Sequence, residues 1–143
     1  MDAKLNESRQ EPVNRDDLVL VHTDQTYEGK QGHIFFAGIS RESAGSQALC
    51  LHVATVQPGS THRPHLHENH ESAVYIISGH AKCRYGKGLR KELIAEGGDF
   101  IYVPAGVPHQ TANRSETEPL VAVVVRTDPN EQESVVLLDE PDQ

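Results

Sequence analysis

The sequence predicts an all-β protein, a barrel or sandwich built from short strands. Apolar runs rich in Val, Ile and Phe recur at intervals of about 8–12 residues, and turn-forming Gly, Pro, Asn and Asp separate them. No stretch keeps a helical apolar period of about 3.6 residues over a dozen positions. We therefore expect many strands and few helices.

Each expected strand is an apolar or alternating run that ends at a turn signal such as Gln57-Pro58-Gly59 or Gly97-Gly98. The expected strands are Asp17–Thr23, Gly32–Ile39, Gln47–Val56, Thr61–His67, Glu71–Ser78, His80–Tyr85, Arg90–Ala95, Asp99–Pro104, His109–Asn113, Leu120–Thr127 and Ser134–Leu138.

The chain of 143 residues has the length of one domain. Residues 1–16 are polar and charged, and we expect a flexible N-terminal arm there. Residues 17–138 form the expected single domain, and the acidic residues 139–143 an expected frayed tail.

Composition disfavours several classes of function. The formal net charge of −8 repels nucleic-acid phosphates and anionic lipids. No apolar stretch has the length of a signal peptide core or a membrane span, so we expect a soluble, cytoplasmic protein. Cys50 and Cys83 lack the spacing of a redox or zinc motif, and we expect both to be reduced thiols in the core.

Histidine is the unusual residue, because four of the nine lie between positions 62 and 70. Side chains alternate along a strand, so His65 and His67 point to the same face and can share one ion. A third imidazole can come from His109, which follows the turn Pro104-Ala105-Gly106 and begins another strand. The pattern predicts a metal site inside the barrel.

These positions resemble the two sequence motifs of the cupin superfamily. Gly59, His65 and His67 fit the first motif, and the second is matched without a gap by Gly98, Pro104, Gly106, His109 and Asn113. The resemblance covers roughly residues 45–127. The sequence in and around the motifs is similar to that of small RmlC-like cupins, some of which are labelled predicted mannose-6-phosphate isomerases. It implies a double-stranded β-helix, or jelly-roll barrel. We expect Asn113 to brace a turn.

The first motif departs from the family at its glutamate. Counted back from Gly79 the glutamate position is Ser72, whereas counted forward from His67 it is Glu71. We favour Glu71 as the fourth ligand, since a bulge at the strand start can re-aim a side chain. The alternatives are His70 in that place, with His62 as a further alternate, or three histidines with water.

The ligand set of imidazoles and one carboxylate suits one divalent transition metal ion, Fe, Mn, Ni, Co, Cu or Zn. The resemblance implies a dioxygenase, or an isomerase or lyase, that acts on a small oxygen-rich organic substrate. Glu71 would be a ligand or proton shuttle, and Tyr75 or Tyr102 would line the pocket. The alternatives are a binding or sensing cupin without turnover, and a barrel that keeps its histidines without metal.

We also expect a homodimer. Two-fold dimers are the commonest soluble assembly. The polar arm and the predicted strand Asp17–Thr23 offer an edge that two copies can exchange.

Overall fold

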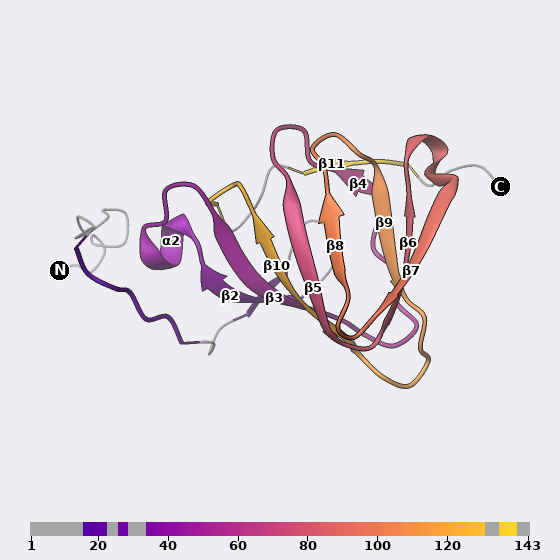
Figure 1. Ribbon diagram of the computed structural model, residues 1–143, viewed down its shortest axis with the longest axis horizontal. Helices are drawn as coiled ribbons and strands as arrows, with labels where there is room; N and C mark the ends of the chain where they lie inside the picture. The colour runs from indigo at the N-terminus through magenta and orange to yellow at the C-terminus, as the bar shows by residue number, and fades with distance from the viewer. Residues whose placement is uncertain (1–15, 23–25, 29–33, 131–134, 140–143) are drawn as a thin grey trace.

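Two antiparallel sheets form the body of the molecule (Figure 1). The computed structural model describes residues 16–22, 26–28, 34–130 and 135–139. The first sheet has, in spatial order, β1 (Thr26–Glu28), β2 (Ile34–Ile39), β3 (Cys50–Val56), β10 (Leu120–Arg126), β5 (Ser72–Ser78) and β8 (Phe100–Val103). The second has β11 (Val136–Leu137), β4 (His65–Leu66), β9 (His109–Asn113), β6 (His80–Tyr85) and β7 (Lys91–Glu96). The prediction of an all-β fold is confirmed.

Helical structure is limited, in the described residues, to α2 (Arg41–Ala44) and the 3-10 turn η1 (Lys87–Leu89). Ser40 begins α2 with a capping box, in which its hydroxyl accepts from the Ser43 backbone N–H. Within the described part of the chain, no helix is long and apolar enough to cross a membrane.

The prediction of a strand at Asp17–Thr23 is wrong for the residues that are described. Residues 18–22 belong to no strand, and Leu18 and Leu20 are 101% and 80% exposed. Apolar residues form a strand only where a neighbouring strand pairs with them, and this segment pairs with none in the described structure. Apart from Asp16 and Asp139, the expected N-terminal arm and C-terminal tail lie outside the described residues.

The core lies between the two sheets because alternate residues of each strand point inward. In β3 the buried positions are Cys50, His52, Ala54 and Val56. The central apolar cluster joins both sheets and consists of Val56, Ile76, Ala81, Ala95 and Leu120. Cys50 and Cys83 are buried and form no disulfide in the described structure, as expected.

Asn113 braces the connection between β9 and β10. Its Nδ2 group donates to the carbonyl oxygens of Val56, at 3.0 Å, and Glu118, at 2.8 Å. Its Oδ1 accepts from the backbone N–H of Ser115 at 2.9 Å. The buried amide thus ties the end of β3 to the loop that returns the chain to β10.

Two glycines with similar backbone angles allow a test of how the hairpins close. Gly79 has a φ of +102°, and an added Cβ would lie 2.7 Å from the Pro119 oxygen and 2.8 Å from the Leu120 Cα. Gly98 has a φ of +97° with nothing within 4 Å of its Cβ position. We expect Gly98→Ala to lower the free energy of unfolding by about 1–3 kcal/mol through backbone strain alone.

Gly79→Ala should cost a further ~1–3 kcal/mol, because backbone atoms must also move aside. Urea unfolding of both variants measures the difference. Equal losses in the two variants would show that the close approach of β5 to the Pro119–Leu120 turn places no demand on this position.

Candidate metal centre

The pairing of β4 with β9 brings two of the predicted ligands together. His65 and His109 are direct Cα partners across the antiparallel ladder, and His67 lies two residues beyond His65 on the same side. One ring nitrogen from each of the three lies within 4.8 Å of the other two. His65 and His67 are buried and His109 is half-buried, so the histidines form a compact group at the inner wall of the barrel.

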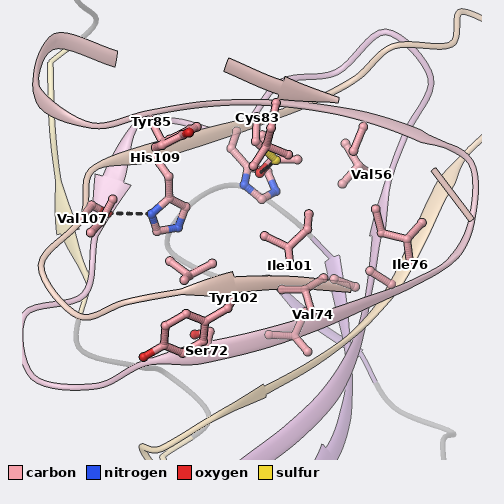
Figure 2. Close-up of a pocket in the computed structure, with 18 of the residues that line it drawn as sticks. Val56, Ser72, Val74, Ile76, Cys83, Tyr85, Ile101, Tyr102, Val107 and His109 are labelled. Atoms are coloured by element: carbon pink, nitrogen blue, oxygen red, sulfur yellow. Dashed lines mark hydrogen bonds between the residues drawn. The ribbon is translucent and has the colours of Figure 1, made fainter. Parts of the chain in front are cut away.

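Backbone carbonyls fix the orientation of two of these rings. His65 Nδ1 lies 2.9 Å from the Arg63 carbonyl oxygen, and His109 Nδ1 lies 2.9 Å from that of Val107 (Figure 2). A carbonyl oxygen can only accept, so each Nδ1 carries the proton and each Nε2 keeps its lone pair. This second hydrogen bond is typical of metal-binding histidines, and the residues present fit a divalent ion.

The turn before His109 is held by the ligand segment itself. The Gly106 N–H donates to the carbonyl oxygen of His67 at 2.6 Å. Gly106 has a φ of +80°, a conformation that glycine adopts without strain. The backbone of His67 therefore positions the turn that precedes His109.

The two candidates for the glutamate position lie on opposite sides of the strand start. Ser72 is buried and lines the cavity, whereas Glu71 is exposed. The Tyr102 hydroxyl donates to the Glu71 carboxylate at 2.5 Å, and the Glu71 N–H donates to Thr127 Oγ1. The residue that points inward is therefore Ser72, with a hydroxyl group, and the Glu71 carboxylate lies outside the histidine group.

The alternate histidines are near the centre but not in it. The His70 ring centre lies 4.9 Å from that of His67, and its Nδ1 lies 3.8 Å from the Asp128 carboxylate. His62 lines the same cavity, with its ring centre 5.9 Å from that of His65.

The two tyrosines have different surroundings. Tyr75 lies on the outer face of the first sheet, where its ring centre is 4.7 Å from that of Phe100, and it does not line the cavity. Tyr102 is at the rim and is 63% exposed. The hydrogen bond to the Glu71 carboxylate raises the pKa of Tyr102, so the phenol stays protonated at neutral pH.

The histidines stand at one end of a cavity of about 430 Å³ between the sheets. This volume lies within the range of small-molecule sites. In Figure 2, His109 and Tyr85 mark one end, Val56 and Ile76 the other, and Ile101 and Val74 lie between them. The cavity therefore has a polar end that carries the ligand group and an apolar end.

A buried polar pair reaches the cavity wall from β3 and β10. Arg126 Nη1 donates to His52 Nδ1 at 3.0 Å, which leaves the His52 proton on Nε2. Burial, reinforced by the Arg126 guanidinium, lowers the pKa of His52 to about 3. His52 is therefore neutral at the cavity wall throughout the physiological pH range.

Some lining residues were not anticipated from the sequence. Thr111 follows His109 by two positions, so strand alternation alone could have placed it on the same face. Tyr85 is the Cα partner of His109, which depends on the pairing of β6 with β9. Cys83 faces Thr111 at 3.3 Å, and burial raises the pKa of its thiol.

Comparison with solved structures shows the same fold in proteins of different descriptions. A protein from Klebsiella pneumoniae with a double-stranded β-helix domain is 21% identical over 96% of both chains, with a TM-score of 0.61. A putative sugar phosphate isomerase from Acidithiobacillus ferrooxidans is 23% identical, over 78% of this chain and 71% of its own, with a TM-score of 0.60.

A Bacillus subtilis oxalate decarboxylase, described with Mn(II) centres, is 26% identical over 76% of this chain, with a TM-score of 0.64. The match covers 29% of that longer chain. No curated protein matches the sequence.

A family model described as the cupin domain matches residues 52–126, which are more than half of the chain. The match contains all three histidines of the ligand group and both sides of the cavity. The two facing sheets are thus a double-stranded β-helix, and the chain belongs to the cupin family.

Proposed function

We propose that this cupin is a metal-dependent enzyme that acts on a small organic molecule through oxygen atoms bound at the metal. The observation that carries the proposal is the orientation of His65 and His109, whose Nδ1 protons face backbone carbonyls, so that Nε2 is the ring nitrogen with the lone pair that a metal needs. The three histidines open into a cavity of the size of a small-molecule site, which supports a working centre.

We propose three protein ligands, His65, His67 and His109, with the remaining positions open to water and substrate. The position of Glu71 favours a site with three histidines, because its carboxylate already accepts a hydrogen bond from Tyr102 at the exposed rim. His70 is near Asp128, and a carboxylate neighbour favours a role as a support for His67.

The chain's own residues would position the substrate around this centre. The apolar walls exclude water, Ser72 and Thr111 offer hydroxyl groups, and neutral His52 offers hydrogen bonding without charge. A bound divalent ion supplies Lewis-acid activation, or dioxygen chemistry when it is redox-active. Glu71, which accepts a hydrogen bond from Tyr102, would serve as the proton shuttle at the rim.

The ion is proposed to be a divalent transition metal. Three neutral imidazoles accept Fe, Mn, Ni, Co, Cu or Zn, and availability decides among them. The similar oxalate decarboxylase has Mn(II) centres, which supports manganese as the first ion to test. A cytoplasmic location remains a prediction from the sequence.

A cupin that holds a ligand without turnover is the second candidate. It is favoured by one observation: among the described residues that line the cavity, there is no carboxylate to act as a general base. Consumption of many substrate molecules per metal ion would establish the enzyme, whereas saturable binding with no product would establish the alternative.

The chain is further proposed to be a homodimer that pairs through the outer face of the first sheet. β10 is apolar on both faces, with Ala122 inward and Val123 outward, as in strands covered on both sides. Cross-strand partners continue this outer face over four strands. Its members are Leu51, Val53, Ala73, Tyr75, Phe100, Val123 and Val125.

The ligand assignment predicts different effects for two variants. His109→Ala removes a neutral ligand, and we expect the affinity for Mn²⁺ or Zn²⁺ to fall by well over 100-fold, beyond the ~10–100-fold typical of supporting residues. Glu71→Gln should bind as the parent does, because the carboxylate is outside the histidine group. Isothermal titration calorimetry of tag-free protein measures both.

Loss of metal binding in Glu71→Gln would make Glu71 the fourth ligand instead. His70→Ala, measured beside it, should lose no more than the ~10–100-fold of a support. A larger loss there would place His70 in the ligand set.

The dimer proposal predicts a change of mass from one exposed position. Phe100 is 79% exposed on the outer face, and Phe100→Glu should give a monomer by light scattering because a charge cannot be buried there unpaired. Ile94→Glu is the matched control, since Ile94 is 51% exposed but lies on β7 in the other sheet. A monomeric parent at high micromolar concentration would contradict the dimer.

A further inference from the structure

The end of the cavity away from the histidines is almost purely hydrocarbon. Its walls come from both sheets, with Val56, Ile76 and Leu120 on one side and Ala81 and Leu93 on the other. Val56 and Ile76 lie opposite the His109 end in Figure 2. Ile76, Ala81, Val56 and Leu120 are each 5% exposed or less and belong to the core cluster, so these walls lie away from bulk solvent.

Charge is missing from the cavity wall. Among the described lining residues there is no lysine, arginine, aspartate or glutamate. Arg126 is held behind the wall by His52 and by the carbonyl oxygen of Asn130, at 2.7 Å. None of the lining residues that the structure describes therefore offers a ligand a charge that competes with that of a metal ion at the histidines.

We propose that the substrate has one oxygen-chelating end and one uncharged, apolar end, and that its apolar end lies against Val56, Ile76 and Leu120. This inference rests on the proposed metal site and goes further by assigning the shape and polarity of the ligand. With three neutral ligands the ion keeps its full double charge, which favours a chelating group that is an anion, such as an enolate or a hydroxamate.

The walls of the apolar end discriminate against sugar phosphates. A phosphate or a row of hydroxyls that reached Val56, Ile76 and Leu120 would be buried without partners, and each unpaired polar group costs about 1–3 kcal/mol. A site that lacks polar partners accepts a hydrocarbon chain instead, at a gain of about four-fold in affinity for each buried methylene. The cavity thus separates this chain from the sugar phosphate chemistry named for one of its structural neighbours.

Alkyl hydroxamates test the inference, since they share one chelating group and differ only in the tail. The protein is first loaded with Zn²⁺ and its metal content is measured, which tests the proposed metal site separately. Calorimetry then compares acetohydroxamate, butanohydroxamate and hexanohydroxamate. We expect the affinity to rise about four-fold per added methylene until the apolar end is filled.

The polar control is the monohydroxamate of adipic acid, which has the length of hexanohydroxamate but ends in a carboxylate. It should bind no more tightly than acetohydroxamate, and a hexose 6-phosphate should not bind. Val56→Thr keeps the side-chain shape but adds a hydroxyl, so it should reduce the gain from the long tail and leave acetohydroxamate unchanged. Val123→Thr on the outer face should change neither.

The outcomes separate the two proposals. If Zn²⁺ does not bind, the proposed metal function fails. If Zn²⁺ and acetohydroxamate bind but affinity does not depend on the tail, or the carboxylate-ended control binds as tightly as hexanohydroxamate, the apolar substrate class is overturned while the metal site stands.

Discussion

The antiparallel register of β4 against β9 is the constraint on which the centre depends. It sets His65 opposite His109, and a shift of one residue would turn one of these side chains to the other face of the sheet. His67 depends on the same strand, because its carbonyl oxygen holds Gly106 in the turn before β9. The backbone bonds to both Nδ1 atoms then aim the rings. The arrangement of the three histidines is therefore set first by main-chain geometry.

The barrel uses one set of inward positions for stability and for the cavity. β5 contributes Ser72 near the histidine end and Ile76 in the apolar cluster. The two residues point to the same face of the strand because side chains alternate along it. Counted back from Gly79, the family motif puts a glutamate where Ser72 stands, and the neighbouring Glu71 carboxylate accepts a hydrogen bond from Tyr102 at the exposed rim. An ion held only by imidazoles keeps more positive charge than one that a carboxylate partly neutralises. This difference connects the register of one strand to the kind of ligand that the cavity favours.

The sequence was sufficient for the features that depend on local pattern. Alternation placed His65 and His67 on one face, turn residues marked the strand ends, and the motif position of Asn113 corresponded to a turn brace. Features that depend on distant pairing were less accessible. Which of Glu71 and Ser72 points into the barrel depends on where β5 begins, and the motif spacing left that position uncertain by one residue. Tyr85 became a neighbour of His109 only through the β6–β9 ladder. At Asp17–Thr23 the apolar residues favoured a strand, but the described residues of this segment pair with no described strand.

X-ray absorption spectroscopy at the zinc edge, on tag-free protein loaded with one equivalent of Zn²⁺, measures directly which side chains hold the ion. A centre built from the three histidines gives the scattering pattern of three imidazoles at about 2.0–2.1 Å, with oxygen ligands from water completing the shell. The same spectrum should be obtained from Glu71→Gln. A shell dominated by carboxylate oxygen, or one with fewer than three imidazoles, would contradict a centre built from His65, His67 and His109.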